Sequence, residues 1–198
     1  MADAGTLAFY DREGATYADW SAPKEAWPWL EKFLAMAPAG PLLDYGCGGG
    51  WAAARMLAAG REVSAFDGSA GLAAEAAKRT GLDVKKMRFE AFAETARYAG
   101  IWASFCLLHA PRAEMPGNLA RIRGALLPGG LFYLGLKRGA GEARDKLDRF
   151  YVYYEAEEIA GLLAAAGFEA PDIRERASEG YDGAAEHALH IYAFAPAA

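Results

Sequence analysis

Residues 42–50 combine an acid with a glycine-rich loop, and this combination can hold a charged small molecule close to the backbone. The apolar pair Leu42 and Leu43 leads into Asp44, and glycine follows at positions 46, 48, 49 and 50. In residues 51–60, apolar side chains fall on one helical face and a glycine stands where the helix would end. The pattern predicts a strand, a glycine loop and a helix, which form the first unit of a nucleotide-binding βαβ fold.

The position of Asp44 indicates which nucleotide this loop would hold. A dinucleotide fingerprint, G-x-G-x-x-G, would need its third glycine where the chain has Trp51. A carboxylate two residues before Gly46 would repel a pyrophosphate at the helix N-terminus, but it suits a ligand with an amino group or another positive centre. S-adenosylmethionine (SAM) has an ammonium and a sulfonium and no phosphate. We therefore favour SAM, and an NAD(P)-linked oxidoreductase is disfavoured.

A second acid, Asp67, ends the predicted strand 63–67, about twenty residues after the glycine loop. At this spacing a carboxylate receives the ribose hydroxyls in doubly wound folds. The alternative role of such an acid is to cap the next helix. Because Ser69 can cap that helix, Asp67 is left free for the ribose, with Gly68 beside it.

Asp44, Gly46 and Gly48, together with Asp67, resemble motif I and the following acid of the class I SAM-dependent methyltransferases. The closest likeness is to small bacterial members of the tellurite-resistance and quinone-biosynthesis types. Two further segments are similar to the family: Leu-Leu-His-Ala-Pro after the fourth strand and Leu-Pro-Gly-Gly before the fifth. These relatives often have Arg-Asp after the glycine loop, where this chain has Trp-Ala, so no acceptor is carried over from them.

The resemblance implies contacts to SAM from several segments. Many class I members carry a Tyr-Asp…Tyr segment before motif I, and Tyr10 and Tyr17 correspond to it as parts of a lid; the alternative is a helix whose rings cover a hydrophobic edge. Residues just past the third strand flank the adenine, which indicates Ala91 and Phe92, with core packing of Phe92 as the alternative. The predicted cofactor-binding residues are Tyr10, Tyr17, Asp44, Gly46, Cys47, Gly48, Asp67, Gly68, Ser69, Ala91, Phe92 and Cys106.

His109 is the candidate catalytic residue, because it follows the fourth strand at the rim where ligands bind. It would act as a general base if the acceptor must lose a proton. The alternative is a histidine that hydrogen-bonds the backbone and shapes the loop. Alignment of the reactants and exclusion of water can supply most of the remaining catalysis.

The other reactive or charged groups are weaker candidates. Lys137 and Arg149 either hold an acidic acceptor or lie on a solvated face, and we assign Arg138 to the solvated face. Cys47 and Cys106 would end neighbouring strands, where their sulfurs could approach each other; we favour a need for small residues over a redox role. Three histidines and two cysteines show no metal-ligand spacing, so no metal is predicted.

The alternation of strands and helices predicts a doubly wound, Rossmann-like three-layer αβα sandwich. Its seven-stranded sheet would be mostly parallel with an antiparallel last strand. Helices are expected at about 23–37, 51–59, 70–80, 115–126 and 155–166, and strands at about 42–44, 63–67, 84–89, 101–106, 131–136, 168–176 and 189–195. We expect a single domain over 1–198, with residues 1–37 as a helical lid segment and 38–198 as the core.

Composition limits the remaining possibilities. The chain has 198 residues, of which 54% are hydrophobic and 24% charged, which fits a globular domain. A net charge of −5 without a basic stripe disfavours nucleic-acid binding. With two cysteines, no signal peptide and no membrane span predicted, a cytoplasmic location is expected. The predicted function is SAM-dependent methyl transfer to a small-molecule acceptor by a monomer or homodimer; the alternative is a non-catalytic SAM-binding sensor or partner subunit.

Overall fold

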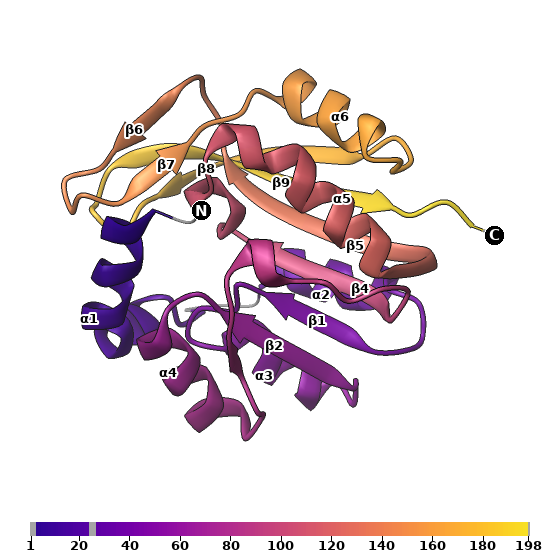
Figure 1. Ribbon diagram of the computed structural model, residues 1–198, viewed down its shortest axis with the longest axis horizontal. Helices are drawn as coiled ribbons and strands as arrows, with labels where there is room; N and C mark the ends of the chain where they lie inside the picture. Colours follow the sequence, from indigo (N-terminus) through magenta and orange to yellow (C-terminus); the bar gives the residue numbers. More distant parts are fainter. Residues whose placement is uncertain (1–2, 24–26, 198) are drawn as a thin grey trace.

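The computed structural model describes residues 3–23 and 27–197 and is built on a seven-stranded sheet (Figure 1). The strands are β1 (Leu42–Tyr45), β2 (Val63–Asp67), β3 (Lys85–Lys86), β4 (Tyr98–Ser104), β5 (Leu126–Lys137), β8 (Asp172–Glu179) and β9 (Ala185–Phe194). Their spatial order is β3-β2-β1-β4-β5-β9-β8. The first five strands in this order, β3, β2, β1, β4 and β5, are parallel to one another. Strand β9 is antiparallel to both of its neighbours, β5 and β8. The predicted Rossmann-like fold with its antiparallel last strand is confirmed.

Helices cover both faces of this sheet (Figure 1). One face packs against α2 (Pro28–Met36), α3 (Trp51–Ala58) and α4 (Ala70–Thr80). The other face packs against α5 (Met115–Ala125) and α6 (Ala156–Ala165). Short 3₁₀ turns occur at Phe89–Ala91 (η1), Leu107–His109 (η2) and Arg112–Glu114 (η3). Within residues 3–23 and 27–197, no helix has both the length and the apolar character needed to span a bilayer.

Strands β1, β4 and the second half of β5 are buried on both faces, as expected for a parallel sheet covered by two helical layers. Side chains alternate along a strand, so Leu42 packs with the α2–α3 layer and Leu43 with the opposite layer. Strand β5 does the same with Tyr133 and Phe132. Because of this alternation, the position of a residue at the end of a strand determines on which face of the sheet its side chain lies, and so whether it can reach a ligand.

Helix α1 (Ala4–Trp20) lies against α4 at the edge where the parallel strands end (Figure 1). Asp3 caps it by accepting from the Thr6 amide at 2.8 Å. The approach of α1 to α4 depends on glycine: a Cβ on Gly71 would lie 2.7 Å from the backbone oxygen of Asp11. A side chain at this position would therefore displace α1.

A two-stranded hairpin, β6 (Glu142–Arg144) and β7 (Phe150–Val152), holds the start of α1. The Phe150 amide donates to Thr6 Oγ1 at 2.8 Å, and Arg144 pairs with Asp3 at 2.7 Å. The sequence did not predict this hairpin, because residues 137–149 are charged and show no alternating apolar pattern.

Several predicted boundaries differ from the structure. Strand β3 has two paired residues rather than six, because the chain turns into η1 at Phe89. Strand β4 begins and ends earlier than predicted, which leaves Phe105 and Cys106 in the loop after it. Helix α2 begins at Pro28; of the predicted helix 23–37, residues 24–26 lie outside the described residues. Strand β5 begins at Leu126 and includes the Pro-Gly-Gly turn, at a register irregularity with β4.

We predict that Gly71→Ala lowers the free energy of unfolding by about 1–3 kcal/mol, because the new methyl group overlaps the α1 backbone. Gly161→Ala is the matched control: it lies inside α6, nothing is within 4 Å of a Cβ there, and it should stabilise the protein by about 0.5–1 kcal/mol. Thermal and urea unfolding of both variants measure the difference. Equal stability of the two variants would show that α1 is not closely packed on α4.

Candidate functional site

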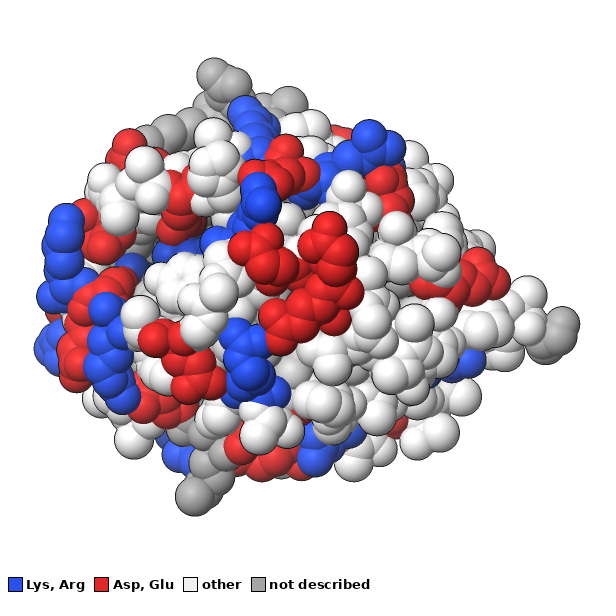
Figure 2. Space-filling view, turned by 90° about the horizontal axis from the view of Figure 1, so that it is seen from above, with Lys and Arg blue, Asp and Glu red and all other residues white. Residues whose placement is uncertain are grey.

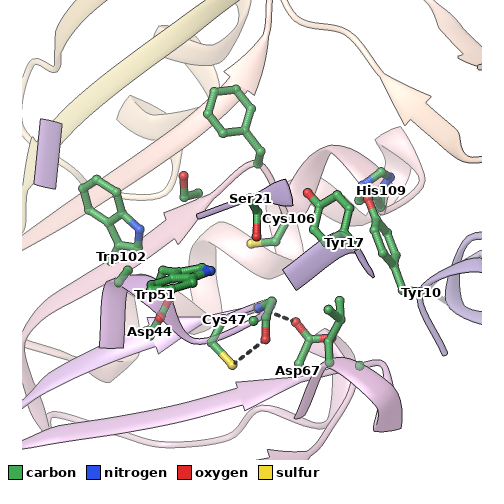
Figure 3. A pocket seen from close by; sticks show the side chains of 18 of the residues that line it. Tyr10, Tyr17, Ser21, Asp44, Cys47, Trp51, Asp67, Trp102, Cys106 and His109 are labelled. Atoms are coloured by element: carbon green, nitrogen blue, oxygen red, sulfur yellow. Dashed lines mark hydrogen bonds between the residues drawn. The ribbon is translucent and has the colours of Figure 1, made fainter. Parts of the chain in front are cut away.

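A cavity of about 510 Å³ opens where β1, β2 and β4 end, with α1 on one side (Figure 3). It is the position at which open α/β sheets bind ligands. Figure 3 shows Tyr10, Tyr17 and His109 on one side and Trp51 and Trp102 on the other. Of the predicted site residues, the cavity wall contains Tyr10, Tyr17, Asp44, Gly46, Cys47, Gly48, Asp67, Gly68, Cys106 and His109. Ser69, Ala91 and Phe92 are not in this wall.

The glycine loop has the conformation that its sequence predicts. Gly46, Gly48 and Gly50 have φ angles of +67°, +53° and +78°, in the left-handed region that side chains disfavour. At Gly46 a Cβ would also lie 2.6 Å from the Cβ of Cys106, whereas nothing lies within 4 Å at Gly48. The loop is thus packed on one side and open toward the cavity at Gly48.

Asp44 is buried at the end of β1 and anchors the start of α3. Its Oδ2 accepts from the Ala53 amide at 2.9 Å. Burial, with a smaller contribution from the charge of Asp67, raises the pKa of Asp44 to about 7. A positive ligand group would favour the ionised form of this carboxyl and offset the cost of burying it.

Asp67, at the end of β2, connects two elements of the cavity. Its Oδ2 accepts from the Gly48 amide at 2.8 Å and its Oδ1 from the Ser69 amide at 2.8 Å. Burial raises its pKa to about 6 against the effect of these two hydrogen bonds. Ser69 caps α4 through Leu72, as predicted, and its hydroxyl also contacts Asp11 at 2.7 Å. This capping role accounts for the absence of Ser69 from the cavity wall.

Of the two phenylalanines after β3, Phe89 lines the cavity and Phe92 does not. Phe89 is in the cavity wall, whereas Phe92 is in the core, with ring centroids 5.2 Å from Tyr45 and 5.5 Å from Phe66. The one-turn helix η1 rotates the chain between the two phenylalanines, and Ala91 is exposed. A short 3₁₀ turn has no periodicity that could have indicated this choice from sequence.

A buried polar chain connects α1 to the rest of the site. Tyr10 Oη lies 3.1 Å from His109 Nε2, and Arg149 Nη1 donates to Tyr10 Oη at 3.3 Å. Arg149 Nε in turn donates to Asp145 Oδ2 at 2.8 Å. His109 Nδ1 lies 2.6 Å from the carbonyl oxygen of Phe150, which can only accept, so Nδ1 carries the hydrogen and Nε2 accepts from Tyr10. Burial lowers the pKa of His109 to about 4, so its ring is neutral at pH 7.

Sequence reasoning missed most of the aromatic wall. Trp20, Trp27, Trp102 and Phe105 all line the cavity, as does Trp51. Trp51 stands where the dinucleotide fingerprint would have its third glycine. Its indole N–H donates to the Ala18 carbonyl oxygen at 2.7 Å, and this hydrogen bond joins α3 to α1. The number of tryptophans was the signal in the sequence that could have indicated an aromatic wall. The four indoles come together only when α1, α2, α3 and β4 pack in the fold.

The two cysteines have separate partners. Cys106 Sγ donates to the Tyr45 carbonyl at 3.0 Å, while Cys47 Sγ lies 3.7 Å from the Gly48 oxygen (Figure 3). Both thiols are free, and burial raises both pKa values well above the ordinary range. Because the thiolate is the reactive form, this environment favours the packing role over the redox role. Among the described residues, no group of three His, Cys, Asp or Glu side chains could hold a metal ion.

Three cations near the end of β5 differ in environment. Arg138 is exposed and pairs with Glu155 and Glu175, in agreement with the predicted solvated face. Lys137 pairs with Glu186 at 2.5 Å, and Arg149 is 1% exposed beside Asp145. On the surface viewed in Figure 2, Lys and Arg side chains are interspersed with Asp and Glu.

Comparison with known proteins relates part of the chain to a methyltransferase family model and the fold to solved methyltransferase structures. The family model of the methyltransferase domain matches residues 42–130. A search of curated proteins finds no match.

Solved structures with this fold include 1,6-didemethyltoxoflavin-N1-methyltransferase of Burkholderia thailandensis, solved with 1,6-didemethyltoxoflavin and S-adenosylhomocysteine (SAH). It is 24% identical, and the alignment covers 98% of this chain and 88% of that chain with a TM-score of 0.78. DhpI, solved with SAH, is 21% identical over 97% of this chain and 96% of its own, with a TM-score of 0.71. Phosphoethanolamine N-methyltransferase 2 of Haemonchus contortus, solved with phosphomonomethylethanolamine and SAH, is 17% identical over 95% of this chain and 59% of its own, with a TM-score of 0.71.

The raised pKa of Asp44 predicts an effect of pH on stability. Because its pKa is about 7 when folded and near 3.8 when unfolded, the folded state keeps a proton that the unfolded state releases between these values. This contribution to stability is therefore present at low pH and lost as pH rises through about 7. Asp44→Asn should make the ligand-free protein more stable than wild type at pH 8, by on the order of 1 kcal/mol or more, with a smaller difference at pH 5.

Melting temperatures from pH 5 to pH 8 test this prediction. Asp83→Asn, at an exposed position after α4, is the control and should change stability little at either pH. A stability difference between Asp44→Asn and wild type that stays constant with pH would contradict the assignment.

Proposed function

We propose that this chain, which has a methyltransferase domain at residues 42–130 and the fold of the class I SAM-dependent methyltransferases, transfers the methyl group of SAM to a small-molecule acceptor. The observation that carries the proposal is the pair of buried carboxylates, Asp44 and Asp67, at the ends of neighbouring strands on either side of an open glycine loop. We also propose a cytoplasmic location, in keeping with two free cysteines.

The residues of the cavity fit SAM group by group. Asp44 is placed to receive the ammonium, and the charge of that group would lower the pKa of the carboxyl. Asp67 uses one lone pair on each oxygen for the backbone, so further lone pairs remain for ribose hydroxyls. Phe89 supplies an apolar face for the adenine. The buried indole N–H of Trp102 has no hydrogen-bond partner in the described protein.

When bound, SAM supplies a methyl group on a sulfonium; the acceptor's lone pair bonds to the methyl carbon, the carbon–sulfur bond breaks, and SAH keeps that electron pair. The protein's part is to align the acceptor and to exclude water. Tyr10, Tyr17 and Trp20, all on α1, cover one side of the cavity and serve this purpose.

Where the acceptor has a proton to lose, we assign its removal to Tyr10 and His109 together. The proton would pass to Tyr10 Oη while the hydroxyl hydrogen of Tyr10 moves to His109 Nε2, 3.1 Å away. Arg149, which donates to the same Tyr10 oxygen, stabilises the negative charge that develops on it. His109 is a weak base, and a weak base suffices because methylation makes the proton of the acceptor more acidic. The hydrogen bond to Phe150 holds the tautomer, so the loop-shaping role and the catalytic role of His109 coincide.

Calorimetric titration with SAM, SAH and NADH tests the cofactor assignment. Wild type should bind SAM and SAH and not NADH. Asp67→Asn keeps the shape of the side chain but removes its charge, and should weaken both affinities about tenfold or more. Asp83→Asn serves as the control and should bind like wild type. Binding of NADH instead, or of none of the three ligands, would overturn the proposal; binding of SAM without turnover of any acceptor would favour the non-catalytic SAM-binding protein.

The Tyr10–His109 pair is tested by the variants Tyr10→Phe and His109→Asn. With an acceptor that loses a proton, each variant should lower kcat by about 100-fold, whereas SAH affinity should change little. The double variant should be no worse than the single variants, since the two residues act as one unit. A purely structural role would instead lower the melting temperature of His109→Asn and leave kcat of the folded protein unchanged.

A further inference from the structure

The charged residues of the cavity wall are all acids. Asp3, Asp44 and Asp67 are in the wall, and no Lys or Arg of residues 3–23 and 27–197 joins them. An anionic acceptor entering this cavity beside the cofactor would lose its hydration and would meet no cationic side chain in the wall. The cavity therefore disfavours acceptors that carry a carboxylate or a phosphate.

The cations of the neighbouring elements are each paired with an acid, and one of these acids, Asp3, is itself in the cavity wall. Arg149 lies among the rings of Phe9, Tyr10, Tyr151 and Tyr181, at 5.1 to 5.9 Å from their centroids, and pairs with Asp145. Lys137 is 3.9 Å from the centroid of Tyr151 and pairs with Glu186, and Arg144 pairs with Asp3. Neither Lys137 nor Arg149 is thus free to hold an acidic acceptor, the alternative that the sequence left open.

Phe105 is held in the cavity wall by a strained backbone. Its φ of +54° is in the left-handed region, which costs a phenylalanine on the order of 1 kcal/mol or more and persists where the surroundings enforce it. The surroundings do so here: the Phe105 amide donates to the Gly135 carbonyl at 3.0 Å, and the ring lies over Gly135, where a Cβ would be 3.2 Å from the ring carbons. The edge of the ring is also fixed against His190, with centroids 5.8 Å apart.

The cavity wall that contains Phe105 also contains other aromatic rings and two serine hydroxyls. Trp20, Trp27 and Trp102 contribute indole rings, and Ser21 and Ser104 contribute hydroxyls. Trp20 is 42% exposed, one of two large apolar side chains exposed in the described protein, so it stands at the opening of the cavity. An exposed tryptophan beside a wall of rings is typical of a site that receives another flat ring.

From the acid-only charge of the cavity and the strained, pre-positioned ring of Phe105, we infer that the methyl acceptor is an uncharged planar aromatic or heteroaromatic molecule that stacks on Phe105. The inference rests on the proposed methyl transfer and specifies the acceptor. Its nucleophile would be a ring nitrogen, an amine or a hydroxyl, each of which is neutral before the reaction. Phe105 is the residue that determines this specificity.

Binding of matched probe pairs to the SAH-loaded protein tests the inference without requiring turnover. Suitable pairs are 5-hydroxyindole with indole-5-carboxylate and 4-hydroxyquinoline with quinoline-4-carboxylate, measured by calorimetry. In each pair we expect the neutral member to bind about tenfold more tightly or better. Phe105→Leu should weaken the neutral probes about fivefold while SAH affinity stays within about twofold, and Phe105→Tyr should retain both affinities. Phe194→Leu, the same change at the end of β9 outside the cavity wall, is the control.

The outcomes separate this inference from the function on which it rests. Wild type that fails to bind SAH overturns the proposed function and the acceptor class together. Normal SAH binding with carboxylates preferred, or with no preference within the pairs, overturns the acceptor class alone. Neutral probes that bind Phe105→Leu as well as wild type overturn the role of Phe105.

Discussion

The hydrogen bond from the Gly48 amide to the Asp67 carboxylate, 2.8 Å long, connects the loop after β1 to the end of β2. The same carboxylate receives the amide of Ser69, directly before α4, and Asp44 receives an amide at the start of α3. Two buried carboxylates are therefore held by backbone N–H groups next to helix N-termini, where negative charge is favoured. A nucleotide fold that would otherwise suit a phosphate thus presents acids to its ligand. This arrangement favours a ligand with a positively charged group over one with a phosphate.

Helix α1 turns an open strand-end site into a cavity. Its polar contacts reach three separate parts of the core: Asp11 contacts Ser69 on the α4 side, Tyr10 contacts His109 after β4, and Thr6 contacts Phe150 on β7. Because one of these contacts is also part of the proposed proton path, the position of α1 and the chemistry are coupled. The close approach at Gly71 gives α1 a defined depth over the site. In the proposed function, α1 thus both covers the cofactor and positions the base.

The distribution of charge explains how a chain with 21 Lys and Arg residues can form an acidic cavity. The cations near the site are paired with Asp145, Glu186 and Asp3, and all three also pack against aromatic rings. A guanidinium among rings retains favourable interactions despite its burial. Arg149 therefore stabilises the contact between α1 and the β6–β7 hairpin and contacts the site through the Tyr10 hydroxyl. Apart from its acidic residues, the cavity wall is formed by uncharged and largely aromatic side chains.

The sequence alone determined the order of the strands and helices of the main sheet, the glycine loop with Asp44 and Asp67, and the cap at Ser69. These features are local: each depends on spacing within one strand–loop–helix unit, and such spacing is visible in the chain itself. The predicted bounds of helix α2, of strand β3 and of other strands were less accurate. Strand pairing and short 3₁₀ turns, rather than periodicity, decide where those elements begin and end.

Only the tertiary structure decided the aromatic wall, the burial of Arg149 and the choice of Phe89 over Phe92. Tyr10 and His109 are 99 residues apart in the chain, and Tyr10 and Arg149 are 139 apart. No local pattern records such contacts, since they arise when separate helices and strands pack together. The same holds for Phe105, whose left-handed conformation depends on Gly135 in the neighbouring strand. The part of the cavity proposed for the cofactor is therefore visible in the sequence, while the part proposed for the acceptor forms only in the assembled fold.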